Sequence, residues 1–85
     1  MTDRPHRATL TFDYGAERLA TVVERSLRQE VGEIDDDRST TVLDRDGAVL
    51  ELTVDADDLV ALRAAANTWL SLVEVAERTA ETVDF

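Results

Sequence analysis

The feature that most constrains the fold is a segment near the C-terminus, residues 62–76, with the sequence LRAAANTWLSLVEVA. It holds no proline or glycine and is rich in alanine and leucine, which favour a helix. On a wheel of about 100° per residue, small and apolar residues cover roughly two thirds of the circumference, whereas a surface helix needs an apolar arc of little more than about 100°. We therefore expect this helix to be covered on more than one side.

The helix has a narrow polar stripe and two apolar sectors. The stripe contains Arg63, Asn67, Ser71, Glu74 and Arg78. The first apolar sector contains Leu59, Leu62, Ala66, Trp69, Leu70 and Val73. Of these, Leu62, Trp69 and Val73 are expected in the core. The second apolar sector contains Ala61, Ala64, Ala65, Thr68, Leu72 and Val75. This second sector either packs against another helix of the same fold or docks a helix of a partner, because its alanines permit close approach.

Length and composition predict a small single domain, residues 1–85, in which 44% of the residues are hydrophobic. A domain of this size leaves much apolar surface exposed and often needs a partner. Residues 1–5 are expected to be loose. The absence of cysteine excludes disulfides and thiolate metal sites. No run approaches the roughly 18 apolar residues of a membrane helix, and the start of the chain lacks the apolar stretch of a signal peptide, so we expect a soluble cytoplasmic protein.

The charge balance narrows the class of function. The chain has 19 acidic residues against nine basic ones, all arginine, and a net charge of −10. So acidic a chain lacks the basic surface that a free-standing nucleic-acid-binding protein needs. The composition favours a salt-loving cytoplasm, because in molar salt the Debye length falls to about 3 Å and screens repulsion between carboxylates. An ordinary acidic protein from a GC-rich genome is the alternative.

The N-terminal third of the chain predicts a strand and a helix. Residues 6–12, HRATLTF, alternate in polarity, which is typical of a half-buried strand. Its core-facing residues are Ala8, Leu10 and Phe12. Residues 15–30 carry their apolar side chains on one stripe and predict an amphipathic helix. We expect Asp13 to cap the start of this helix and Gly32 to stop it.

Residues 39–54, STTVLDRDGAVLELTV, predict a β-hairpin. Asp46-Gly47 lies between two β-rich runs and is a strong hairpin signal, because a type I′ turn needs positive φ at both central residues. With these two residues as the loop, the facing pairs on the core side are Leu43 with Leu50, Thr41 with Leu52, and Ser39 with Val54. The other side of the hairpin is of mixed polarity and faces either solvent or a partner.

The last helix is expected from Ala56 to about Thr79, with Asp55 as its N-cap and with Asp57 and Asp58 at the positive end of its dipole. The element order is then β-α-β-β-α. An antiparallel three-stranded sheet with the third strand central and both helices on one face satisfies the rules for connections between elements. The sequence therefore predicts an α+β fold.

Catalytic, cofactor-binding and metal sites find little support in the sequence. Lysine and cysteine are absent, and the serines have no histidine at a suggestive spacing. His6, the single histidine, is expected to be an exposed strand residue. The isolated glycines form no phosphate-binding loop. The loop 33–38, EIDDDR, lacks the alternating ligands and central glycine of a calcium loop. We expect no enzyme, no cofactor and no metal.

The run from Asp57, DDLVALRAAANTWLSLVEVA, resembles the end of the small dimerising (Pcc-type) subunit of the KEOPS tRNA-modification complex. Members of that family typically carry an Ala-Asp, a Leu-Arg-Ala run and an Asn-Ser pair on a last helix, and they share the β-α-β-β-α order. The resemblance covers Ala8 to about Ala80, and the acidic composition makes the chain haloarchaeal-like. The chain departs from the family pattern at Thr68, where serine is usual, and at Ser71, where a basic residue is common.

The resemblance implies a non-catalytic role in tRNA modification. KEOPS installs a threonylcarbamoyl group on the adenosine beside the anticodon (t6A), and its small subunit forms a homodimer and docks helices of the catalytic transferase subunit. The implied partners are a second copy and that transferase subunit, with tRNA contacted only indirectly or weakly and no membrane. The expected docking surface is the second apolar sector of the last helix. The alternatives are a stand-alone dimeric adaptor and a KH-like RNA-binding module, although the GXXG loop of a KH domain is absent.

Overall fold

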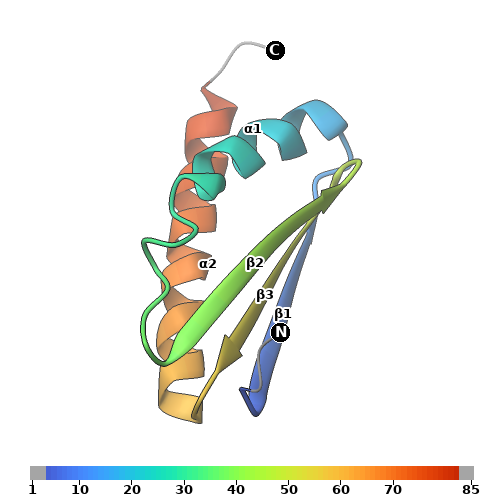
Figure 1. The fold of residues 1–85 in the computed structure, drawn as a ribbon. Coiled ribbons are helices and arrows are strands. Elements are labelled where there is room, and N and C mark those ends of the chain that lie inside the picture. Colours follow the sequence, from blue (N-terminus) through green and yellow to red (C-terminus); the bar gives the residue numbers. More distant parts are fainter. Residues whose placement is uncertain (1–3, 83–85) are drawn as a thin grey trace.

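The structure, a computed structural model, describes residues 4–82 as an α+β fold. Its elements are β1 (His6–Asp13), α1 (Glu17–Arg28), β2 (Ser39–Asp46), β3 (Val49–Ala56) and α2 (Leu59–Glu81). In Figure 1, α2 runs along one face of the sheet and α1 lies on the same face, near the end that carries the β2–β3 turn. The predicted fold class and element order are therefore confirmed.

The three strands form an antiparallel sheet in the order β1-β3-β2, so β3 is central as predicted. The core lies between this sheet and the two helices. Its largest fully buried side chains are Val23, Leu27, Leu50, Leu52, Val54 and Trp69. Burial of one such aliphatic side chain stabilises the fold by about 1.5–3 kcal/mol. The outer face of the sheet carries no helix among residues 4–82.

The start of α1 differs from the prediction. Ala16 occupies the N-cap position and makes no side-chain cap bond. Asp13 does not cap the helix, because its carboxylate accepts the main-chain N–H of Gly15 at 2.9 Å and so holds the turn between β1 and α1. Gly15 has a φ of +70° in this turn, a conformation that favours glycine. The helix ends at Arg28, before the predicted stop at Gly32.

The β2–β3 hairpin has the predicted faces and a different register. Asp46 pairs with Val49, so the two loop residues are Gly47 and Ala48. Among residues 4–82 positive φ occurs only at glycine, and Gly47 has a φ of +61°, which fits a type II′ turn in place of the expected type I′ turn. The observed core pairs are Leu43 with Leu52, Thr41 with Val54, and Ser39 with Ala56. A shift by two residues keeps every side chain on its face, because the strand period is two.

The start of α2 also lies later than predicted, at Leu59, because β3 continues to Ala56. Asp58 is the N-cap, and its carboxylate accepts the main-chain N–H of Ala61 at 2.8 Å. Asp55, the predicted cap, remains in the sheet. It accepts two hydrogen bonds from the Arg7 guanidinium on the neighbouring strand, at 2.7 and 3.2 Å.

The face that α2 turns to the sheet lies between the two predicted sectors. Its buried residues are Ala61, Ala65, Trp69, Val73, Ala76 and Ala80. Of the residues predicted in the core, Trp69 and Val73 are buried and Leu62 is half-buried. Leu59 and Leu70 of the same sector are 53% and 45% exposed. The reason is packing: small alanines let the helix approach the sheet closely, while Trp69 fills the space over the strands. The polar stripe around Asn67 is exposed, as predicted.

The length and apolar composition of α2 also bear on whether the chain contains a segment that could span a membrane. By these two properties alone α2 is able to cross a membrane, so the expectation that no segment approaches that limit is wrong. Core helices pass the same test, and α2 packs on the sheet through Trp69 and Val73.

The N-terminal segment is described from Arg4 onward, and the expectation of a loose segment falls largely on residues 1–3, which lie outside the described residues. Arg4 forms an ion pair with Asp57 at 2.9 Å and donates a hydrogen bond to the Asp37 carbonyl at 3.2 Å. These contacts tie the start of β1 to the loops at the same end of the sheet.

Candidate partner interface

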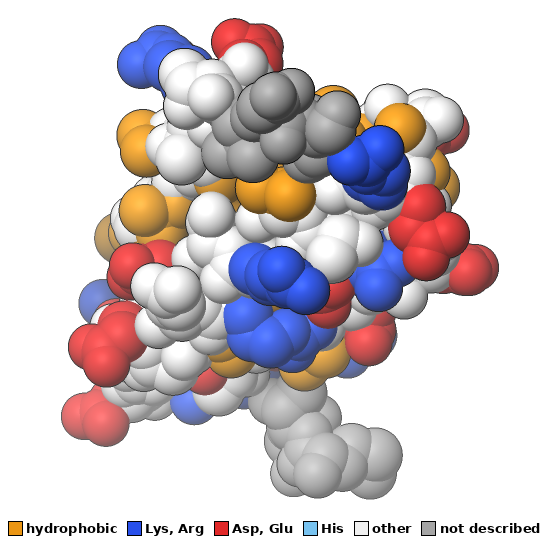
Figure 2. Space-filling model, turned by 90° about the horizontal axis from the view of Figure 1, so that it is seen from above, with side chains coloured by type: hydrophobic (Ala, Val, Ile, Leu, Met, Phe, Trp, Pro, Cys, Tyr) orange, Lys and Arg blue, Asp and Glu red, His pale blue; other side chains and the backbone are white. Residues whose placement is uncertain are grey.

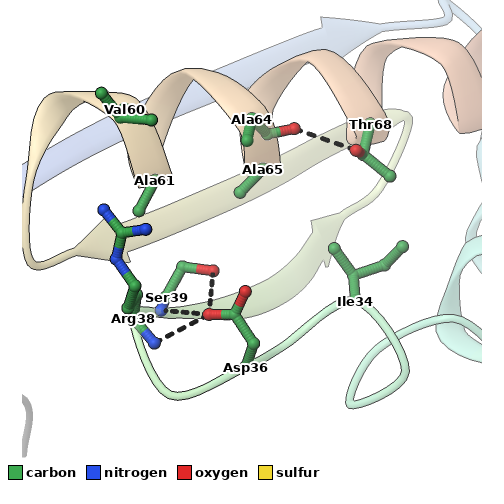
Figure 3. A pocket seen from close by; sticks show the side chains of 9 residues that line it. All are labelled: Ile34, Asp36, Arg38, Ser39, Val60, Ala61, Ala64, Ala65 and Thr68. Atoms are coloured by element: carbon green, nitrogen blue, oxygen red, sulfur yellow. Dashed lines mark hydrogen bonds between the residues drawn. The ribbon is translucent and has the colours of Figure 1, made fainter.

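One flank of α2 carries two hollows, and the six residues of the second apolar sector line them. The first hollow lies between the N-terminal half of α2 and the loop that leads into β2, and it has a volume of about 170 Å³. Figure 3 shows the side chains around it. They are Ile34, Asp36, Arg38, Ser39, Val60, Ala61, Ala64, Ala65 and Thr68.

The second hollow lies between the C-terminal half of α2 and α1, with a volume of about 160 Å³. Its lining residues are Ser26, Leu27, Glu30, Leu72, Val75, Ala76 and Thr79. Thr68 in the first hollow and Leu72 in the second are one helical turn apart. The two hollows therefore follow one another along the same side of the helix, and we refer to them together as the α2 flank.

The six predicted interface residues occupy different depths in the α2 flank. Ala61 and Ala65 are 8% and 6% exposed, so they form its floor and also belong to the core. Leu72 is half-buried, whereas Ala64, Thr68 and Val75 are exposed at the rim. A side chain that enters from outside thus meets an apolar floor of alanines.

Val60, which is not one of the six predicted residues, is a further apolar side chain at the rim of the α2 flank. Val60 is 70% exposed and Val75 is 55% exposed, at opposite ends of the flank. Thr68 adds an apolar group, because its hydroxyl donates to the Ala64 carbonyl at 2.9 Å and leaves the methyl group for contacts (Figure 3). The rim of the helix is therefore suited to apolar contacts along its length.

The opposite rim of the first hollow is charged. The Asp36 carboxylate accepts the main-chain N–H groups of Arg38 at 2.7 Å and Ser39 at 3.0 Å. The Arg38 hydrogen bond is the largest cause that lowers the Asp36 pKa, so the carboxylate stays ionised at neutral pH. The Arg38 guanidinium donates to Asp58 and lowers the pKa of that carboxyl as well. The first hollow thus combines an apolar floor with an ionised edge.

The sequence analysis did not identify Ile34 and Arg38 as part of this site. Ile34 is the single apolar residue in the acidic segment 33–38, which was the signal available for it. The sequence offered no comparable signal for Arg38. Its position at the rim depends on the turn in which the Asp36 carboxylate accepts the Arg38 main-chain N–H. Among residues 4–82 no group of three or more metal-ligating side chains comes together.

Comparison with protein families gives a match over almost the whole fold. The model of the family described as "Transcription factor Pcc1" matches residues 7–81. The matched segment contains the α2 flank and all but the first residue of the elements above. A search of curated proteins finds no match. Because the family model covers well over half of the sequence, the chain belongs to the Pcc1 family.

Proposed function

We propose that this chain is a non-catalytic dimerisation and scaffold subunit of the KEOPS complex. In this role it supports t6A formation on tRNA by docking helices of the catalytic transferase subunit. The match of residues 7–81 to the Pcc1 family supports membership of the complex. The docking role rests on the geometry of the α2 flank.

The observation that carries the docking role is apolar surface that the fold leaves uncovered on α2. Amphipathic helices bind in grooves by placing apolar anchors at helical spacing. The α2 flank offers two successive hollows for such anchors, over the alanine floor of Ala61 and Ala65 and beside the exposed Val60 and Val75. An approaching helix would cover these groups and bring its own polar residues to the rim at Arg38.

The charge of the chain favours this role over direct binding of nucleic acid. With 19 acidic and nine basic residues, the chain repels a phosphate backbone over most of its surface. The same charge opposes DNA binding by the isolated chain. We therefore propose that tRNA is contacted indirectly or weakly.

The test is co-purification of variants with the transferase subunit in high salt. Ala64→Glu places a carboxylate at the exposed rim of the first hollow, where docking would bury it without a partner. Burial of an unpaired charge is costly, so we expect this variant to fold and to lose the transferase. Asn67→Glu adds the same charge to the exposed polar stripe and should bind as the wild type does.

Two results would contradict the proposal. Retention of the transferase by a folded Ala64→Glu protein would place docking elsewhere. Recovery of RNA without a transferase would favour the KH-like alternative. Ala65→Glu is a further control, because Ala65 is 6% exposed and packs in the core, so that variant should unfold rather than lose binding alone.

A further inference from the structure

Residues 29–38, which connect α1 to β2, contribute one carboxylate to each hollow of the α2 flank. Half of the residues in this connection are acidic, namely Glu30, Glu33, Asp35, Asp36 and Asp37. Asp36 lines the first hollow and Glu30 lines the second. Each apolar hollow therefore has a negative charge on the side opposite α2.

The Asp36 carboxylate has one oxygen in use and one left over. Its Oδ1 accepts the main-chain N–H groups of Arg38 at 2.7 Å and Ser39 at 3.0 Å, and the Ser39 hydroxyl lies at 3.5 Å. Figure 3 shows the second oxygen apart from these bonds, on the side of the carboxylate that faces α2. Within residues 4–82 no hydrogen bond or ion pair reaches that oxygen. It is therefore an acceptor available to a donor that enters the first hollow.

The Arg38 guanidinium, at the same rim, is directed to another carboxylate. It donates to Asp58, the N-cap of α2. The ion pair of Arg38 is thus made with Asp58 and not with Asp36. The first hollow keeps an ionised carboxylate with no ion-pair partner in the described part of the chain.

Glu30 repeats this arrangement in the second hollow. It is half-buried and is the one charged side chain among the residues that line this hollow. Its carboxylate forms no hydrogen bond or ion pair with any residue of the described range 4–82. A partly buried charge is costly without a partner. The second hollow therefore also combines an apolar floor with a carboxylate that a cation would stabilise.

The connection that carries both carboxylates is held in place by its main chain and by apolar contacts. The Glu30 carbonyl accepts the N–H groups of Glu33 and Ile34, both at 3.1 Å. The side chains of Val31 and Ile34 pack against the core. The two charges are thus positioned before a partner arrives, which lowers the entropy cost of binding.

The spacing of the two hollows matches the repeat of a helix. Ala64 in the first hollow and Val75 in the second are 11 residues apart on α2. This separation is about 16 Å along the axis and about three turns, so residues 11 positions apart lie on nearly the same face. A single helix that lies along α2 can therefore direct one side chain to each carboxylate.

We propose that the transferase helix docked in the α2 flank carries two basic side chains, about three turns apart, that pair with Asp36 and Glu30. This inference rests on the docking role of the proposed function and names the chemistry of the docked helix. Apolar anchors of that helix fill the hollows over the alanine floor. The two ion pairs fix its register along α2, since charge complementarity contributes specificity more than affinity.

The first test removes each charge without changing the size of the side chain. Asp36→Asn keeps a carbonyl oxygen for the bonds from Arg38 and Ser39, and Glu30→Gln breaks no contact of the described fold. Affinity for the transferase subunit is measured in about 1 M KCl, where the Debye length of about 3 Å removes long-range attraction but screens partly buried pairs much less. We expect each variant to weaken binding by about tenfold.

Matched controls come from the same connection. Glu33→Gln and Asp37→Asn remove the same charge at exposed positions that line neither hollow. They should bind within about twofold of the wild type. If Asp36→Asn also lowers the melting temperature, Glu30→Gln decides, because its side chain holds no described contact.

The second test identifies the basic residues of the transferase by exchange of charge. Single changes of lysine or arginine to glutamate on its surface helices should weaken binding, and Glu30→Arg should restore binding for one of them. A double-mutant cycle with Asp36→Asn locates the second position. We expect the two positions to lie about 11 residues apart on one helix, that is, about three turns.

The remaining outcomes separate this inference from the proposed function. Equal weakening by Glu30→Gln, Asp36→Asn and the two controls would assign the effect to overall charge and overturn the inference, while docking itself stands. Loss of self-association in place of transferase binding would show that a second copy occupies the flank, and would also overturn it. A wild-type chain that does not bind the transferase would remove both proposals.

Discussion

Trp69 is the residue on which most of the packing depends. It is fully buried under α2, and its indole N–H donates to the Thr41 hydroxyl at 2.9 Å. Thr41 is itself 6% exposed, so water does not replace this acceptor readily. A buried indole needs such a partner. The sequence contained a signal for this hydrogen bond, because it predicts Thr41 on the core face of the hairpin and holds a single tryptophan, which is predicted in the core.

Replacement of Thr41 tests this hydrogen bond. In Thr41→Val the indole N–H is left buried without an acceptor, which costs about 1–3 kcal/mol of unfolding free energy. Thr41→Ser keeps the hydroxyl and should lose clearly less. Chemical denaturation followed by tryptophan fluorescence measures both. Loss of stability in Thr41→Ser but not in Thr41→Val would show that the methyl contacts of Thr41, and not the hydrogen bond, matter.

Glu24 is the centre of an ion-pair network between α1 and β2. Its carboxylate accepts Arg28 at 2.6 Å and Arg45 at 2.7 Å, and its side chain is 17% exposed. Hydrogen bonds from Arg28 and then Arg45 are the main causes that lower the Glu24 pKa below its ordinary value of 4.5. A lowered folded-state pKa means that the stabilisation is complete above pH 4.5 and is lost as the pH falls through the pKa of the folded state.

The corresponding prediction concerns acid stability. Glu24→Gln should lower the free energy of unfolding by up to about 1 kcal/mol at neutral pH. The difference from the wild type should shrink as the pH falls below 4.5, because the wild-type carboxylate is then protonated. Denaturation curves at a series of pH values give this difference directly. A difference that stays constant with pH would assign the effect to packing.

At the scale of the element, the hairpin contains an unfavourable pair. Asp44 on β2 faces Glu51 on β3, and both are exposed. Like charges directly opposite in a ladder destabilise it by about 0.2–1 kcal/mol. Asp44→Thr should therefore raise the melting temperature in dilute buffer, and the gain should shrink in concentrated salt. Asp46→Thr, which removes the same charge opposite Val49, is the matched control and should gain less.

The hairpin also shows what the sequence could and could not predict. The core face of β2 and β3 was predicted correctly because strand periodicity survives a shift of two residues. The register was not predicted correctly, because Asp46-Gly47 is compatible with a type I′ turn over residues 46–47 and with a type II′ turn over residues 47–48. The two turns differ in the sign of φ at Asp46, and in the structure that φ is not positive. The element order was predictable from polarity and connection rules. The α2 cap was not, because Asp55, Asp57 and Asp58 are all suitable caps and tertiary contact with Arg7 decided the choice.

The rotation of α2 about its own axis could not be predicted from the sequence either. An apolar arc of two thirds of a helix leaves its orientation almost free, because many rotations bury an apolar sector. Close packing of Ala61 and Ala65 on the sheet fixed it. The six candidate interface residues were found as a sector, but their division into floor and rim depends on this rotation.

At the scale of the whole molecule, excess negative charge is the dominant feature. Most arginines of the described fold already pair with carboxylates, for example Arg7 with Asp55, Arg38 with Asp58 and Arg45 with Glu24. Figure 2 shows arginines near the middle of one face, with acidic side chains along both margins. Because the net charge is −10, ion pairing leaves many carboxylates that repel one another.

This excess predicts a strong dependence of stability on salt. Two effects oppose each other: salt weakens exposed ion pairs, and it also screens repulsion among the surplus carboxylates. With 19 acidic and nine basic residues, repulsive pairs outnumber attractive ones, so screening should dominate. We expect the melting temperature to rise from about 0.1 M to about 3 M KCl, with most of the gain before the Debye length reaches about 3 Å. Excluded osmolytes such as sucrose strengthen burial without screening charge, so they should stabilise less at low ionic strength. A melting temperature that is flat or falls with KCl would contradict adaptation to a salt-rich cytoplasm, and an equal rise in sucrose would assign the effect to hydrophobic burial instead.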